Sequence, residues 1–275
     1  MTRPPFGFGP SGDSEESGDP ADPLAALGNT PDLSAMLHQL GDLLSGETGP
    51  VNWQVARQSA MAVIGADAGT TGAEASEVAD AIRLADLWLD PVTSLPSGVT
   101  STEAWSRRRW LEATREAWSE LVEPVAAQVS GAMGQAIPEE MRSMAAPLIG
   151  VMTQVGGLIF GGQVGQALGT LATEVVASTD IGIPLGPSGV AALLPESIRA
   201  FGEGLAVPAD QVRLFIALRE AAHQRLFGHV PWLRGHLFSA VRSYAEGITI
   251  DSSRLEDLVG TVDPSDPESL QRALG

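Results

Sequence analysis

Glu220 and His223 are the two residues whose types and spacing could do chemistry. They match the second half of the pattern His-Glu-x-x-His, in which two histidines bind zinc and the glutamate activates a metal-bound water. Arg219 occupies the position of the first histidine. A guanidinium stays protonated and has no lone pair for a metal, so Arg219 cannot be a zinc ligand.

A further histidine, His229, follows His223 by six residues. This is the spacing of a third zinc ligand in one class of zinc proteases, but the glycine expected there is displaced to Gly228. We therefore treat His229 as a weak candidate for a metal ligand. We expect His38 at the surface and His236 in a packed or capping position. Because the chain has no Cys, any metal would rest on His, Asp, Glu or backbone atoms.

The element that must position these residues is a helix, which we expect to begin with Asp210 as its N-cap. Helical spacing places Arg219 and His223 on its apolar side, with Glu220 beside His223. The apolar members of that side are Val212, Phe215, Ile216, Leu226 and Val230. A buried charge must be paired or bound, because desolvating an isolated charge is very costly. The helix thus predicts a polar cluster whose positive centre is a zinc ion or the Arg219 guanidinium.

Apolar residues at helical spacing predict that the rest of the chain is also mainly α. The expected helices are 33–44, 52–64, 73–89, 101–122, 143–173, 195–202 and one that begins at Pro231 and ends at Gly247. The helix 101–122 is expected to start at 101 because Thr100 to Glu103 fits a capping box. The irregular stretch 180–189 could supply one short edge strand. We therefore expect a helical domain with at most one or two short strands.

Composition divides the chain into three parts. Residues 1–48 are acidic and rich in Pro and Gly, which predicts a disordered tail with one short helix. Residues 49–262 form the expected folded domain. Residues 263–275 form a C-terminal extension that we expect to be cut short, because its incipient helix has almost nothing to cover.

Four glycines recur at every fourth residue from Gly157 to Gly169, within a stretch of 143–173 that has no charged side chain. Such a stripe lets two helices approach closely, and in a more apolar segment it would mark a transmembrane pair. Glutamines in the stretch lower its hydropathy, and one span without a basic flank disfavours membrane insertion. We expect a central, fully buried helix.

The charge balance limits the partners. The net charge is −18 and all 16 basic residues are Arg, which argues against nucleic acid or an anionic membrane. The run Arg107 to Arg109 lies among glutamates at helical spacing, which favours a solvated, ion-paired face. No apolar signal segment follows Met1, so we expect a cytoplasmic protein. An unidentified peptide or protein remains as the expected partner, and homo-oligomerisation stays open.

Several motifs together resemble a bacterial zincin-like family whose members are labelled as hydrolases or zinc-dependent metalloproteases. A sister branch is labelled as associated with biosynthesis of a deazaflavin coenzyme. The resemblance covers about residues 49–262. It is carried by Gly49-Pro50-Val51-Asn52-Trp53, by 81–90 (AIRLADLWLD), by 95–100 (LPSGVT) with Trp105, by 218–227 (LREAAHQRLF) and by 230–234 (VPWLR) through to Ile250-Asp251.

The resemblance implies a mainly helical zincin-like domain in which Glu220 is the catalytic general base and His223 a zinc ligand. It also implies a further helical segment, beyond this chain's last residue, that contributes an acidic ligand. Two hypotheses follow. The first is a zinc-dependent metalloprotease or hydrolase with a degenerate Arg-Glu-x-x-His. The second is an inactive zincin-like domain in which Arg219 pairs with Glu220 or a distant carboxylate, replaces the metal, and leaves a structural or protein-binding module.

Overall fold

A computed structural model of the chain describes residues 49–135 and 139–247, with side chains for 49–128 and 153–247. The chain separates into two compact units, Met1–Ser45 and Gly46–Gly275, and all the described residues belong to the second. The predicted tail at 1–48, including His38, and the extension at 263–275 lie outside the described residues, so these remain predictions.

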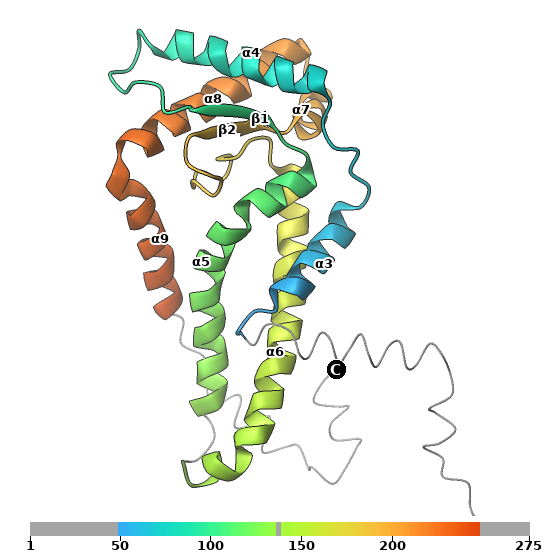
Figure 1. The fold of residues 1–275 in the computed structure, drawn as a ribbon, viewed down its shortest axis with the longest axis vertical. Coiled ribbons are helices and arrows are strands. Elements are labelled where there is room, and N and C mark those ends of the chain that lie inside the picture. Colours follow the sequence, from blue (N-terminus) through green and yellow to red (C-terminus); the bar gives the residue numbers. More distant parts are fainter. Residues whose placement is uncertain (1–48, 136–138, 248–275) are drawn as a thin grey trace, which may run out of the picture. The chain divides into compact units, whose positions relative to one another are not determined.

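The described part is mainly α, as the sequence predicts, with one two-stranded parallel sheet (Figure 1). In chain order its elements are α3 (Trp53–Ile64), α4 (Gly72–Leu89), β1 (Ser101–Ala104), α5 (Arg107–Gln135), α6 (Glu139–Glu174), β2 (Val190–Leu193), α7 (Pro195–Gly202), α8 (Ala209–His229) and α9 (Pro231–Glu246). Local capping defines the first boundaries. Asn52 caps α3 by accepting from the Val55 amide at 2.9 Å, and Thr71 opens α4 with a reciprocal capping box to Glu74.

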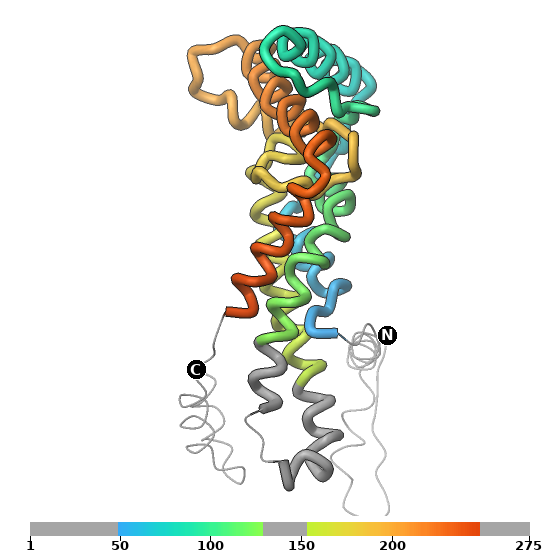
Figure 2. Tube along the Cα trace, turned by 90° about the vertical axis from the view of Figure 1, so that its left-hand side faces the viewer, coloured from blue at the N-terminus to red at the C-terminus, as the bar shows by residue number. Residues whose placement is uncertain are grey.

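One hydrophobic core lies among α3, α5, α6 and α9, which run alongside one another in Figures 1 and 2. The glycine stripe of α6 faces α3 so closely that a side chain at Gly161 would lie 2.5 Å from the Asn52 carbonyl oxygen. The amide of Asn52 donates to the Gly157 carbonyl at 3.0 Å. The stripe therefore joins two helices of this chain by direct backbone contact.

Burial along α6 corrects one expectation. Gly161 and Gly165 are buried, but Val155 and Ile159 on other sides of the helix are 44% and 60% exposed. The helix is central to its core without being fully buried, because neighbours cover only part of its circumference. Among the helices of the described residues, none is long and apolar enough to cross a membrane.

The second core joins α4 and α8 to the sheet, with Val78, Ile82 and Ala85 of α4 against Ile216 and neighbouring residues of α8. β1 pairs with β2 in parallel, with Ser101 opposite Val190 and Ala104 opposite Leu193. The expected helix start at Ser101 is therefore wrong. These residues are extended, and α5 begins six residues later, at Arg107. The segment 180–189, where an edge strand was considered, holds turns, and the second strand comes just after it.

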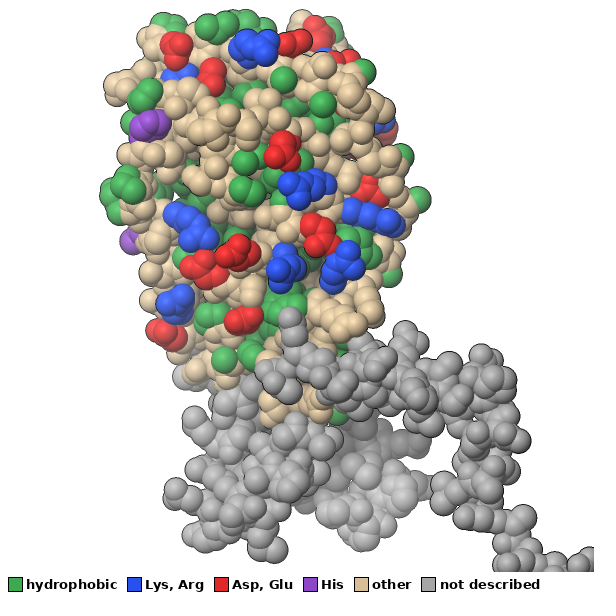
Figure 3. Space-filling view, viewed as in Figure 1, with side chains coloured by type: hydrophobic (Ala, Val, Ile, Leu, Met, Phe, Trp, Pro, Cys, Tyr) green, Lys and Arg blue, Asp and Glu red, His purple; other side chains and the backbone are tan. Residues whose placement is uncertain are grey.

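Opposite charges are interspersed on the face shown in Figure 3. The arginine run at the start of α5 is tied to acidic and backbone groups: Arg107 pairs with Glu196 at 3.1 Å, Arg109 pairs with Glu103 at 3.4 Å, and Arg108 donates to the Gly65 carbonyl. Each side chain of this run thus has a partner within the protein.

Candidate functional site

Helix α8 carries the Arg-Glu-x-x-His sequence and packs against its neighbours through small residues. Ala217 and Ala221 are fully buried, which lets the helix approach α4 and β2 closely. Gly98 lies against the same helix, and a side chain there would collide with the Gln224 carbonyl group. The loop before β1 is thereby fixed beside the polar residues of α8.

Glu220 is the most enclosed of the predicted site residues, at 1% exposed. Its Oε1 accepts from Ser178 Oγ at 2.6 Å and from Gln224 Nε2 at 2.8 Å. Its Oε2 accepts from the Thr179 amide at 3.1 Å and from Thr179 Oγ1 at 2.6 Å. These four donors match the four lone pairs of a carboxylate. No lone pair of Glu220 is left for a water or a metal.

His223 joins the network through Thr179, whose Oγ1 lies 2.9 Å from His223 Nδ1. Because the single hydroxyl hydrogen of Thr179 is used in the short bond to Glu220, Nδ1 of the imidazole must be the donor in this contact. That leaves His223 Nε2 as the nitrogen with a lone pair in the neutral ring. The ring is partly buried and also contacts Phe227, with centroids 6.0 Å apart.

Arg219 does not reach Glu220. It forms an ion pair with Asp180 Oδ1 and donates to the Asp180 carbonyl oxygen at 2.6 Å. Its side chain is 44% exposed, against 17% for Asp180. The other carboxylate oxygen of Asp180 accepts from the Val176 amide at 3.1 Å. Adjacent residues of α8, Arg219 and Glu220, therefore hold the same loop, 178–180, from its rim and from its interior.

The orientation of α8 differs from the predicted one. The buried face consists of Val212, Ile216, Ala217, Glu220, Ala221, Gln224 and Arg225. Phe215 and Arg219, predicted to face inward, are exposed. The alanines decide the rotation, because only small side chains fit where α4 and the sheet crowd the helix. Asp210 is not the N-cap either: the helix begins at Ala209, and Asp210 lies in the first turn, where a carboxylate favours the helix dipole.

Arg225 is a buried cation that the sequence analysis missed. Its side chain is 2% exposed, and its guanidinium donates to Asp86 at 2.9 Å, to Asp90 at 2.7 Å and to the Leu95 carbonyl at 2.8 Å. Burial alone would lower the pKa of Arg225, but the hydrogen bonds to Asp90 and Asp86 outweigh it and raise that pKa. Arg225 thus ties α8 to the end of α4 and to the loop that follows it.

The remaining histidines make local contacts. His229 Nδ1 bonds to the Arg225 carbonyl at 3.0 Å, one turn earlier in the same helix. His236 stacks edge-on against Trp232, with ring centroids 6.0 Å apart.

A catalytic zinc needs three protein ligands as a rule. Among the side chains that the structure describes, in 49–128 and 153–247, no three of His, Asp or Glu come close enough together to hold a metal ion. Glu220 has its lone pairs occupied and Arg219 has none, so the motif offers His223 Nε2 alone. The described residues therefore do not fit a catalytic zinc.

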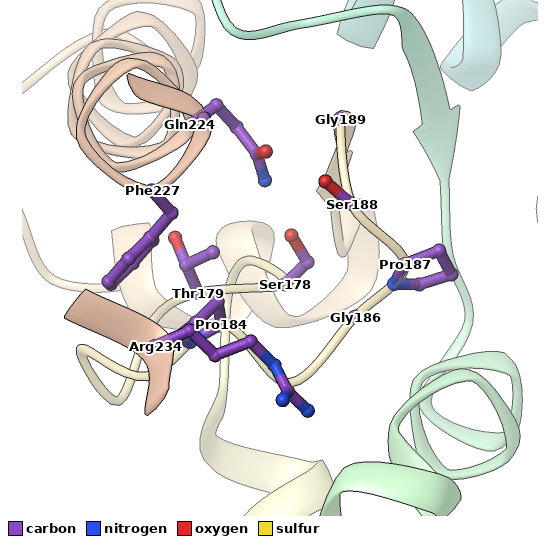
Figure 4. A pocket seen from close by; sticks show the side chains of 11 residues that line it. Ser178, Thr179, Pro184, Gly186, Pro187, Ser188, Gly189, Gln224, Phe227 and Arg234 are labelled. Carbon is purple, nitrogen blue, oxygen red and sulfur yellow. The ribbon is translucent and has the colours of Figure 1, made fainter. Parts of the chain in front are cut away.

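A small pocket opens beside this network (Figure 4). Ser178, Thr179 and Gln224, which hold Glu220, also line the pocket, and Ser188 and Gly189 face Gln224 across it. Neither the loop 178–180 nor Gln224 was singled out from the sequence. The polar run Ser178-Thr179-Asp180 is separated from the end of α6 by three residues and lies in a turn, where polar residues are ordinary, so no specific signal in the sequence marked it.

Comparisons with known proteins give one solved structure and one family model that are similar to this chain. A crystal structure from Chloroflexus aurantiacus, described as a candidate hydrolase with a novel fold, is similar over 82% of this chain and 74% of that chain, with 21% identity and a TM-score of 0.48. No curated protein matches the chain. A family model described as a zincin-like metallopeptidase matches residues 51–275. Since that match spans most of the chain, the protein belongs to the zincin-like metallopeptidase family.

Proposed function

We propose that this protein is a zincin-like domain without catalysis at its Arg-Glu-x-x-His helix, in which the Arg219–Asp180 ion pair stands in place of a metal. The observation that carries the proposal is Glu220, which is 1% exposed and accepts four hydrogen bonds from the protein. The helix then serves as a structural hub. A peptide or protein is the partner we expect for the domain.

The state of Glu220 argues against a role as general base. A base must lie within hydrogen-bond reach of the proton that it removes, directly or through one water. Each oxygen of Glu220 is already saturated by Ser178, Thr179 and Gln224. To act on a substrate, the carboxylate would have to break at least one of these bonds in a nearly dry environment, which costs about 1–3 kcal/mol for each group left unpaired.

The charge of Arg219 fits the same proposal. In a metal site the cation would draw anionic and lone-pair groups toward this end of the helix. Here a permanent guanidinium charge holds Asp180, and through that residue the loop that encloses Glu220. A fixed cation satisfies the loop without a bound one.

Metal content and coupling energy test the proposal together. After incubation with zinc chloride and desalting, we expect the wild-type chain to keep well below one zinc per molecule by mass spectrometry. A double-mutant cycle of Arg219→Ala and Asp180→Ala is expected to give a coupling of about 1 kcal/mol in urea unfolding. The matched cycle at Arg213 of α8 and Glu77 of α4, a pair whose carboxylate is more exposed, should give less. One zinc per chain, lost on His223→Ala, would overturn the proposal.

The second candidate is a zinc-dependent hydrolase, which family membership and the free Nε2 of His223 favour. Its remaining ligands would have to come from outside the described residues. Chelator-sensitive peptide hydrolysis that disappears in Glu220→Gln would establish this candidate.

Ancestry has its own test in Arg219→His, which restores the complete His-Glu-x-x-His pattern. We expect this variant to gain some zinc binding over wild type. If it gains none, the ligand geometry of a zinc site has not been preserved in this chain.

A further inference from the structure

The pocket beside Glu220 has a volume of about 100 Å³. It lies among the loop 178–189, the end of α8 and the start of α9. An engineered protein cavity of about 150 Å³ accommodates benzene, which has six heavy atoms. A ligand of about four to six heavy atoms therefore matches this pocket in size.

One end of the pocket offers acceptors. Both hydrogens of Gln224 Nε2 are used, toward Val190 O at 3.0 Å and Glu220 Oε1 at 2.8 Å, which fixes the amide so that its Oε1 is left to accept. Ser178 donates its hydroxyl hydrogen to Glu220 at 2.6 Å and keeps its lone pairs. Gln224 is 7% exposed and its amide points into the pocket in Figure 4. With a buried carboxylate directly behind them, these acceptors favour an ammonium group.

The other end offers donors. Arg234 pairs with Glu120 through one nitrogen, at 2.9 Å, and its guanidinium has further N–H groups. The hydroxyl of Ser188, which has no hydrogen-bond partner among the described residues, belongs to the first end, because it faces the Gln224 amide across the pocket. In Figure 4, Arg234 and Gln224 lie on opposite sides, with the Ser178 and Thr179 hydroxyls between them. A guanidinium with N–H groups to spare favours a carboxylate.

We propose that this pocket binds a small free α-amino acid of the size of glycine or alanine. Its ammonium group meets Gln224 Oε1, Ser178 Oγ and Ser188 Oγ, and its carboxylate meets Arg234. Pro184, Pro187 and Phe227 supply apolar walls for a short side chain. The inference does not depend on whether the Arg-Glu-x-x-His helix is catalytic, because Glu220 acts here only as a fixed negative charge behind the pocket.

Titration of the full chain with L-alanine, followed by saturation-transfer NMR of the ligand, tests the proposal. For a ligand of six heavy atoms we expect a Kd on the order of 0.1–1 mM. Alaninamide lacks the carboxylate and N-acetylalanine lacks the ammonium group, so each should bind at least about tenfold more weakly. L-Leucine exceeds the pocket in size and should not compete.

Variants separate the pocket from unspecific binding. Arg234→Gln and Ser188→Ala should each weaken alanine binding severalfold, and both residues are accessible enough for the fold to survive. Arg83→Gln, which removes an exposed arginine from α4, is the matched control and should bind as wild type does. Lack of saturable binding up to about 50 mM, or equal binding of alanine and alaninamide, would overturn the proposal. So would an Arg234→Gln variant, folded by circular dichroism, that binds alanine unchanged.

Discussion

Helix α8 carries two buried charged residues, Glu220 and Arg225, whose hydrogen-bond partners differ in kind. Glu220 is surrounded by hydroxyl, amide and backbone donors, whereas Arg225 is clasped by the carboxylates Asp86 and Asp90 and by a carbonyl. Both are enclosed, and each carboxylate oxygen of Glu220 and each guanidinium nitrogen of Arg225 has a hydrogen-bond partner, which a buried charge needs in order to persist. The residue at the position of a zinc ligand, Arg219, is by contrast half-exposed at the rim.

The Arg225 cluster yields a prediction at this scale. Arg225→Met keeps the volume of the side chain but leaves Asp86 without its buried cation. We expect the free energy of unfolding to fall by about 3 kcal/mol in urea titrations. Arg83→Met, at an exposed pair with Asp80, is expected to cost less than about 0.5 kcal/mol. Equal effects in the two variants would mean that Arg225 is no more than a surface pair in solution.

Sequence reasoning found the motif at this scale but not its partners. Glu220 and His223 stand out because their spacing is local and can be seen in four residues. Ser178 and Thr179 are more than forty positions away, and nothing near them encodes that their hydroxyls meet a glutamate. The wrong inward assignment of Phe215 and Arg219 has a related cause: a hydrophobic stripe predicts one face, while close packing of Ala217 and Ala221 selects another.

At the scale of elements, the start of α5 is capped by a residue from a distant loop. Asp67, in the loop between α3 and α4, accepts from the Arg108 amide in the first turn of α5 at 2.8 Å and from the Gly69 amide at 2.9 Å. Partial burial raises the pKa of Asp67, but these amide hydrogen bonds outweigh it and bring the pKa below its usual 3.8. The carboxylate also favours the dipole of α5.

The lowered pKa of Asp67 predicts a pH dependence. A carboxyl whose pKa is lower in the folded state stabilises the fold above its unfolded pKa, and this contribution is lost as pH falls through the folded value. We expect Asp67→Ala to cost about 1 kcal/mol at pH 7, as for a lost helix cap, with the gap to wild type narrowing below about pH 4. Urea unfolding at pH 7, 5 and 3 measures it. A gap that stays constant across these pH values would contradict the capping role.

The contact of α3 with α6 predicts a second effect at this scale. Gly161→Ala would press a methyl group against the Asn52 carbonyl and should destabilise the fold by about 1–3 kcal/mol. Gly156→Ala, in the same helix but facing open space, should stabilise it by up to about 1 kcal/mol through helix propensity. Melting temperatures of the two variants should therefore move in opposite directions. A melting temperature of Gly161→Ala that is unchanged or raised would refute the close contact.

Across the whole molecule, local signals predicted most helices and long-range pairing was missed. α7 and α9 fall where the sequence placed them, because proline at the first helical position and apolar spacing are local features. The sequence of Thr100 to Glu103 is compatible with a helix cap and also with a strand that contains β-branched residues. Pairing with β2, some ninety residues away, decides in favour of the strand. Family membership agrees with the resemblance drawn from the motifs. Whether the motif can bind zinc could not be judged from the sequence, because the four hydrogen bonds that occupy Glu220 are visible only in the structure.

The bond from Thr179 N–H to Glu220 is one of the bonds that hold the loop 178–180 to α8. Because the carboxylate behind that amide is itself sealed by two hydroxyls, deuterium from solvent can reach the Thr179 position only when α8 lifts from the loop. The hydrogen–deuterium exchange rate of the Thr179 amide would therefore report how often α8 separates from the loop 178–180.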